Sequence, residues 1–328
     1  MPFVYLTEQG AEIARRGQSL EVRSDGRKLA DLEIHHVQGL CVLGRVHLTL
    51  PAMELLLRHR VETALLTVDG RLKGHLVPPR PHNVRARLAQ YRQSLDPDAR
   101  LRWAVTFVRA KLHNAGQMLR RHAYNHPESG LAREADEVLA AADRATQAAD
   151  PASLRGIEGY GSRVYFAGLS RMCLGELTFP GRSTRPPKDP FNALLSFGYV
   201  LLCGELQALL EAAGLEPYAG FYHENADGRP SLALDLLEQF RHPVIDRFCL
   251  TLNNRRMLTA ADFVAGPEGG FRLAPGALKL FLAEYDQWMR TSPRQQRPSP
   301  REEVRAQVEQ LVGALRDGKP YAPYLFES

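Results

Sequence analysis

The chain has 328 residues, enough for two domains and a substantial hydrophobic core. Its 44% hydrophobic and 24% charged residues are typical of a soluble globular protein. We find no apolar run approaching the ~18 residues of a membrane span and no signal-peptide pattern, so we expect a cytoplasmic protein that does not contact a membrane. The four cysteines lie far apart with no CxxC pair, which argues against a zinc or iron–sulfur framework and indicates reduced core thiols.

Positive charge is concentrated in the middle of the chain. Residues 81–190 hold 17 Lys+Arg and 11 Asp+Glu, a net charge of +6, whereas the whole chain carries +5. Arginine outnumbers lysine strongly in this part, and arginine suits bidentate contacts with phosphate. The middle third is therefore the candidate surface for a polyanion, although a solvated protein face can have the same composition.

Residues 1–78 have the pattern of a small β-sheet domain. Short β-favouring runs alternate with turn signals, and Arg16-Gly17, Asp25-Gly26 and Asp69-Gly70 predict hairpins. Pro51–Arg58 predicts one short helix within this domain. The fold class we expect is α+β multidomain, with the small N-terminal β-sheet domain followed by a larger all-α domain.

The remainder of the chain is expected to be a proline-rich linker at 79–90 and a helical domain at 91–328. Ser153 is a plausible N-cap for one of its helices, and Asp189 for another. Between these two helices, the Pro-rich stretch Phe179–Pro190 has the composition of a phosphate-contacting loop and equally of a disordered linker. The main expected helices are Arg85–Ser94, Pro97–Ala123, Leu131–Ala149, Ser153–Leu169, Phe191–Ala213, Pro275–Arg290 and Pro298–Leu315.

A cluster of glycines surrounds Glu158 in the sequence RGIEGYG. Gly156, Gly159 and Gly161 each cost about 1 kcal/mol relative to alanine inside a helix, so the cluster needs a compensating reason. Glycine lets another backbone approach closely, whether that of a packed helix or of a DNA strand. We therefore favour an open site at Glu158, although a surface ion pair with Arg155 would also account for this glutamate.

The stretch GFYHENADGRPSLALDLLEQFR, residues 220–241, combines a histidine, a turn and an acidic helix. His223 precedes the turn, and Asp235 and Glu238 lie three residues apart, on one side of the helix that follows. The other helix positions are nearly all apolar, as in a buried helix. Two buried carboxylates require a cation or good hydrogen-bond donors. A metal site and a structural pairing of Glu238 with Arg241 are both open from these residues alone.

Glu158 in RGIEG, His223 in GFYH and the two acids in SLALDLLEQFR together resemble the CRISPR-associated integrase family, the metal-dependent endonucleases that capture new spacers. PPKDPFNALLSFGY, residues 186–199, and GLEPYAGFYH, residues 214–223, are also similar to the family. The similarity covers nearly the whole chain and is poor after about residue 290. It implies that the β domain serves dimerisation and that the helical domain is catalytic.

The family pattern implies a metal site made of a glutamate, a histidine and a later acid. These correspond here to Glu158, His223 and Glu238, and Asp235 is expected to be a supporting or alternative ligand. Carboxylates with one imidazole suit Mg²⁺ or Mn²⁺ better than a thiolate-seeking metal. The resemblance also implies a reaction in which 3′-OH ends of new spacer DNA are joined into the repeat by transesterification.

The resemblance further implies the partners. They are double-stranded DNA as spacer precursor and as repeat, a second copy in a homodimer, and a small ferredoxin-like companion Cas protein in a heterohexamer; an accessory iron–sulfur exonuclease is a further candidate. The basic residues we expect to contact DNA phosphates, positioning the DNA without reading its sequence, are Arg109, Lys111, Arg163, Arg182, Arg185, Lys188 and Arg229.

Two other functions remain open from the sequence. The same site could serve a metal-dependent, structure-specific nuclease that cuts branched DNA with water as the nucleophile. The acids could instead be structural, in which case the chain is a non-catalytic DNA-binding assembly module. Joined strands, shortened strands or no metal-dependent reaction would distinguish the three functions.

Overall fold

The chain forms two compact units, which are described separately: Met1–His82 with Leu278–Ser299, and Asn83–Ala277 with Pro300–Ser328. An N-terminal β-sheet region followed by a mostly helical region confirms the predicted fold class. The unit boundaries differ from the expected domains because Leu278–Ser299 groups with the N-terminal unit. The computed structural model describes residues 3–68, 70–77, 83–266, 269–292 and 297–327.

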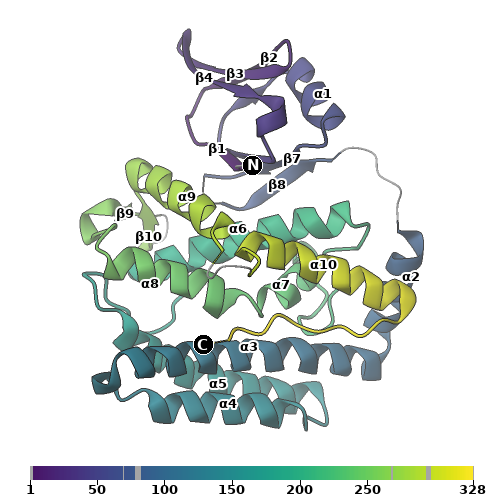
Figure 1. Ribbon diagram of the computed structural model, residues 1–328, viewed down its shortest axis with the longest axis vertical. Coiled ribbons are helices and arrows are strands. Elements are labelled where there is room, and N and C mark those ends of the chain that lie inside the picture. Colours follow the sequence, from purple (N-terminus) through teal and green to yellow (C-terminus); the bar gives the residue numbers. More distant parts are fainter. Residues whose placement is uncertain (1–2, 69, 78–82, 267–268, 293–296, 328) are drawn as a thin grey trace. The chain divides into compact units, whose positions relative to one another are not determined.

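The first unit contains two four-stranded sheets (Figure 1). Its strands are β1 (Phe3–Leu6), β2 (Glu12–Arg16), β3 (Ser19–Ser24), β4 (Arg27–Glu33), β5 (Gly39–Leu43), β6 (His47–Leu48), β7 (Glu62–Leu66) and β8 (Leu72–Leu76). One sheet has the order β1-β5-β7-β8, with β7 and β8 antiparallel and the other pairs parallel. The second has the order β4-β3-β2-β6, antiparallel except for the pair of β2 with β6.

The hairpins of the second sheet follow from turn chemistry. Asp25 has φ 50° and Gly26 has φ 74°, so both residues are left-handed, as a type I′ turn requires. The expected turn at Asp69-Gly70, in the first sheet, lies partly outside the described residues, because Asp69 is not among them. The antiparallel pairing of β7 with β8, which this turn was expected to connect, is present. This unit also contains helix α1 (Leu50–Arg58), the 3₁₀ turn Ile34–His36 and, from Leu278 onward, helix α9 (Pro275–Arg290).

The second unit is helical apart from one short hairpin. Its helices are α2 (Val84–Leu95), α3 (Pro97–Asn125), α4 (Ala132–Ala145), α5 (Pro151–Met172), α6 (Pro190–Ala212), α7 (Ser231–Leu237), α8 (Arg247–Asn254) and α10 (Pro300–Asp317). The shorter elements are the 3₁₀ turns Pro127–Ser129 and Ala260–Asp262, the π-helical turn η3 (Arg241–Asp246), and the strands β9 (Phe263–Ala265) and β10 (Phe271–Leu273). Helices α3, α4 and α5 pack together, and α6 packs against α7, α8 and α10 (Figure 1).

Helix α6 is the apolar centre of this unit. By length and composition it could cross a membrane, so the expectation that no such run exists is wrong. However, 67% of its most apolar window is buried inside the protein, with Leu194, Leu195, Leu202 and Leu206 fully inaccessible. Burial on most sides is what a core helix of a folded domain has.

The start of α5 differs from the sequence expectation. Asp150, and not Ser153, is the N-cap, and its Oδ1 accepts hydrogen bonds from the backbone N–H groups of Ala152 at 2.8 Å and Ser153 at 2.9 Å. Ser153 takes the third helical position and completes a capping box with Asp150. Helix α6 begins as expected, with the Asp189 side chain accepting from the backbone N–H of Asn192.

The C-terminal tail lies beside α3 and ties it to the segment that follows α7 (Figure 1). Asn114 Nδ2 donates to the carbonyl oxygens of Gln239 at 2.7 Å and Tyr324 at 3.0 Å, and Phe326 N donates to Asn114 Oδ1 at 2.8 Å. Tyr324 N donates to Gln239 Oε1 at 2.7 Å, and Asn114 and Gln239 are fully buried. Since such buried amides are costly to leave unpaired, the tail fixes the spacing between the two segments.

Candidate active site

A lysine and two glutamates from three segments meet inside the helical unit. Lys111 on α3 places its Nζ 2.8 Å from Oε2 of Glu238, directly after α7, and donates to Oε1 of Glu158 on α5. The three side chains are 10%, 3% and 18% exposed. Ser162 Oγ also donates to Glu158 at 2.8 Å, and no ion pair with Arg155 is present in the described part of the chain. Glu158 therefore belongs to an interior charged cluster.

The glycines around Glu158 have two different roles. A Cβ added at Gly156 or Gly159 would meet nothing within 4 Å, so these positions border open space, as the expected open site requires. A Cβ at Gly161 would lie 2.5 Å from Cδ2 of Leu112 on α3. Gly161 therefore allows α5 to approach α3 closely enough for Glu158 to meet the lysine.

Asp235 on α7 supports the backbone that carries His223. Its carboxylate accepts hydrogen bonds from the N–H groups of Phe221 at 2.6 Å, Tyr222 at 3.0 Å and His223 at 2.9 Å. Its Oδ1 also lies 2.7 Å from His223 Nδ1. A Cβ at Gly220 would come within 2.8 Å of Oδ2, so only glycine permits this approach.

His223 is thereby turned toward the glutamate cluster. With Nδ1 bonded to Asp235, its Nε2 faces Oε1 of Glu238 at 3.7 Å. A carboxylate that fixes one imidazole nitrogen and leaves the other for a cation is the usual arrangement behind metal-ligating histidines. Both oxygens of Asp235 are already hydrogen-bonded, which fits a supporting residue and not a ligand.

Glu238 contacts a buried polar network through Arg241. Arg241 Nε donates to Glu238 Oε1 at 3.0 Å, and its guanidinium lies 4.6 Å from the ring centre of Tyr199. The hydroxyls of Tyr199 and Tyr165 both donate to Asp246, the latter at 2.9 Å. This network fixes Arg241, and through it the carboxylate of Glu238.

The cluster holds both glutamates in the charged form. Burial would raise the pKa of Glu238, but the charges of Arg241, Lys111 and His223 outweigh it and lower that pKa strongly. Burial would also raise the pKa of Glu158, but the Lys111 ammonium lowers it overall. Burial would lower the pKa of Lys111, and the two glutamates raise it instead. All three groups are therefore ionised at neutral pH.

Glu158, Glu238 and His223 have donor atoms that suit a divalent cation, and the Lys111 ammonium lies between the two carboxylates. No group of three His, Cys, Asp or Glu side chains in the described part of the chain is gathered around one point. Oε2 of Glu238 is buried, and the group that lies against it is the Lys111 ammonium, at 2.8 Å. Two carboxylates and the Nε2 nitrogen of His223, which faces Glu238, have the donor chemistry that suits Mg²⁺ or Mn²⁺ if the ammonium moves aside.

The candidates for DNA contacts separate into two groups. Lys111 is buried within the carboxylate cluster, and Arg182 donates to Asn192 Oδ1 at 2.7 Å with its guanidinium 5.4 Å from the ring centre of Tyr199. Both side chains are held by contacts within the protein, and a phosphate contact for either of them stays a prediction. The candidates that are exposed are Arg109, Arg163, Arg185, Lys188 and Arg229.

The fold and the cluster together define a two-part α+β protein with a buried carboxylate–histidine centre. The family model for "CRISPR associated protein Cas1" matches residues 4–287. The "CRISPR-associated endonuclease Cas1 1" of Thermus thermophilus is 36% identical over 324 residues, covering 98% of both chains. A "CRISPR-associated exonuclease Cas4/endonuclease Cas1 fusion" of Geobacter sulfurreducens is 33% identical over 87% of this chain and 52% of that protein. The chain belongs to the Cas1 family, and the resemblance inferred from its motifs is confirmed.

Solved structures share the fold. A "Casposase bound to integration product" has a TM-score of 0.84 at 24% identity, with 100% of this chain and 96% of that chain covered. A chain of a "Cas6-RT-Cas1--Cas2 complex" has a TM-score of 0.78 at 24% identity, with 99% of this chain and 36% of that chain covered. At this identity the likeness concerns the fold alone.

Proposed function

We propose that this protein is a metal-dependent DNA integrase and endonuclease of CRISPR adaptation. The observation that carries the proposal is the buried cluster in which Lys111 pairs with Glu158 and Glu238 and His223 faces Glu238, in a chain of the Cas1 family. Relatives described as endonucleases and a similar fold bound to an integration product support DNA as the substrate.

The proposed cofactor is Mg²⁺ or Mn²⁺, held by the carboxylates of Glu158 and Glu238 and by Nε2 of His223. When bound, such a cation supplies stabilisation of charge on the phosphodiester oxygens and activation of the attacking hydroxyl. Asp235 holds His223 in orientation through Nδ1, and Arg241 holds Glu238 ionised and in place. Lys111, released from the carboxylates, would donate to a phosphate oxygen of the DNA.

The proposed reaction is a transesterification. The 3′-OH oxygen of the spacer forms a bond to phosphorus in the repeat strand, and the bond from that phosphorus to the repeat's own 3′ oxygen breaks. The leaving oxygen takes up a proton, and the number of phosphodiester bonds is unchanged, so no further reactant is needed. Ser162 donates its hydroxyl to Glu158, but the same carboxylate oxygen accepts from the Lys111 ammonium and is therefore a weak base, so we favour direct attack over a covalent enzyme intermediate.

We propose the same partners that the family resemblance implies. Double-stranded DNA, a second copy and a small companion Cas protein would form a heterohexamer, and the complex containing Cas1 and Cas2 supports this assembly. The fusion of Cas4 with Cas1 in a relative supports an accessory exonuclease. A cytoplasmic location is consistent with Cys41, Cys173, Cys203 and Cys249, which are all free thiols.

The test is a strand-transfer assay on branched DNA that mimics a half-finished integration. Purified protein is incubated with Mn²⁺, Mg²⁺ or EDTA, beside His223→Ala and a control, His36→Ala, which changes a histidine that is 75% exposed. We expect metal-dependent release of the branch with resealing of the host strand, lost in His223→Ala and kept in His36→Ala. Release without resealing would replace the integrase by the branched-DNA nuclease, and activity unaffected by EDTA would refute the proposed metal dependence.

A further inference from the structure

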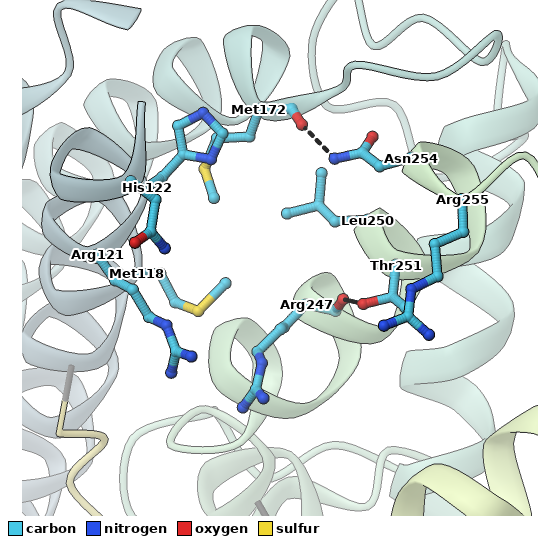
Figure 2. Close-up of a pocket in the computed structure, with 10 residues that line it drawn as sticks. Met118, Arg121, His122, Met172, Arg247, Leu250, Thr251, Asn254 and Arg255 are labelled. Carbon is cyan, nitrogen blue, oxygen red and sulfur yellow. Dashed lines mark hydrogen bonds between the residues drawn. The ribbon is translucent and has the colours of Figure 1, made fainter. Parts of the chain in front are cut away.

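A basic cavity of 260 Å³ lies in the helical unit away from the carboxylate cluster (Figure 2). Two of its walls come from α3 and α8, and α5 contributes Met172 at its C-terminal end. No aspartate or glutamate is present among the described residues that line it. The lining is Met118, Arg121, His122, Asn125, Met172, Arg247, Leu250, Thr251, Asn254 and Arg255.

The cavity combines cationic and apolar surfaces. Figure 2 shows the guanidinium groups of Arg121, Arg247 and Arg255 along the lower side of the cavity, with Leu250 and Met172 above them. The charges of the Arg121 and Arg255 guanidinium groups outweigh the partial negative charges of the nearby helix C-termini, about half a charge each. Guanidinium groups bind phosphate, and apolar side chains cover a nucleobase, so the cavity matches the two halves of a nucleotide.

Two of the arginines are held in place before any ligand arrives. The guanidinium carbon of Arg121 lies 5.9 Å, and that of Arg247 5.7 Å, from the ring centre of Phe326 in the C-terminal tail. His122 adds a buried ring nitrogen, Nε2, that has no hydrogen-bond partner. The preorganised guanidinium of Arg121 and an unsatisfied ring nitrogen together indicate a binding site.

The cavity also lies in line with the carboxylate cluster. Lys111, Met118 and His122 follow one another on α3 at steps of seven and four residues, hence on one stripe of the helix. A rise of 1.5 Å per residue places the cavity about 10–16 Å from Lys111 along α3. At ~3.4 Å per nucleotide of a B-form strand, this distance corresponds to about three to five nucleotides.

We propose that this cavity binds one nucleotide of a single DNA strand that extends from the reacting phosphodiester, an inference that rests on the proposed function. Its volume is slightly below the ~300 Å³ at which pockets for drug-sized ligands begin, so a duplex does not fit and a single nucleotide does. The phosphate pairs with Arg121 and Arg255, and the base lies against Met172 and Leu250.

The sequence supplies matched controls, since each of these two arginines has an arginine neighbour outside the lining. Arg120 pairs with Asp136 on the surface, and Arg256 follows Arg255. The probe is a fluorescein-labelled (dT)₆ with a 5′-phosphate, titrated in EDTA and followed by anisotropy. We expect Arg121→Ala and Arg255→Ala each to weaken binding about tenfold and to lower the salt dependence by about one counterion. Arg120→Ala and Arg256→Ala should change binding less than about twofold.

A charge-neutral variant separates the cavity from the surface charge. Thr251→Trp fills the space without changing the net charge and should weaken binding to the same extent as the arginine variants. Equal losses for neighbouring arginines, unaltered binding by Thr251→Trp, or absence of binding by the unmodified protein would each overturn the proposal. The titration requires neither metal nor strand joining, so the two proposals can fail separately. If the protein joins strands but does not bind the oligonucleotide in the cavity, only the nucleotide-binding proposal is refuted. If it binds the oligonucleotide but never joins strands, only the proposed function is refuted.

Discussion

Replacing Lys111 by methionine tests whether its ammonium is the counter-charge of the two glutamates. The substitution keeps the length of the side chain and removes the charge that lies 2.8 Å from Glu238, whose side chain is 3% exposed. Removing one partner of a buried pair costs about 3–5 kcal/mol, and we expect about 3 kcal/mol because Arg241 still pairs with Glu238. For a unit of this size that loss lowers Tm by about 6–12 °C.

The metal should reverse this loss. A cation bound only by the folded protein at one hundred times its dissociation constant adds about 2.7 kcal/mol, nearly the whole deficit. In the unmodified protein the cation must displace the ammonium, so we expect a smaller stabilisation there. Thermal unfolding followed by circular dichroism, in EDTA and across a Mn²⁺ titration, measures both effects, with the exposed Lys188→Met as the control.

The pH dependence supplies an internal check on the same variant. The pKa values of Glu158 and Glu238 are lowered in the folded protein, so their ionisation stabilises the fold above the ordinary glutamate value of 4.5 and that stability is lost as the pH falls. The gap between Lys111→Met and the unmodified protein should therefore narrow below this pH. An unchanged Tm in EDTA, or equal stabilisation of both proteins by Mn²⁺, would refute the assigned role of Lys111.

Three further outcomes follow from the contacts. Asn114→Ala should cost about 2–3 kcal/mol in chemical denaturation and expose the tail to carboxypeptidase, because it leaves buried carbonyl and amide groups unpaired; intact tail protection would contradict this. Gly159→Ala should raise Tm slightly, since its Cβ meets nothing, whereas Gly220→Ala should abolish strand joining by displacing the Asp235-supported loop, so equal behaviour of the two variants would argue against the assignment. Burial raises the pKa of Cys173 and Cys203 to about 12, so neither should react with a thiol reagent at pH 8 until the protein unfolds, as peptide mapping would detect.

The helices and strands were largely predictable because the hydrophobic periodicity and the turn and cap residues indicate the same boundaries along this chain. The Asp25-Gly26 turn and the Asp189 cap depend on local chemistry, and both are where the sequence places them. The N-cap of α5 was misplaced by three residues because Asp150 and Ser153 are both good caps, and only the capping box distinguishes them.

The acids and the histidine of the candidate site could be predicted from the sequence, whereas the role of Lys111 as their counter-charge could not. Glu158, His223 and Glu238 follow from the family resemblance, and Asp235 from its spacing to Glu238. In the sequence, Lys111 is one of several basic residues on the same helix. Its burial depends on how closely α5 approaches α3, and no local sequence pattern predicts that approach. The same reason explains why no pattern in the tail predicts its hydrogen bonds to α3.

The most direct test of the central claim is the position of the metal. Anomalous diffraction from crystals soaked in Mn²⁺ measures it without relying on activity. We predict one strong peak bounded by the carboxylates of Glu158 and Glu238 and by Nε2 of His223, with the Lys111 ammonium displaced from its present position. A cluster that keeps Lys111 between the glutamates and shows no manganese, or manganese bound elsewhere in the chain, would contradict the account.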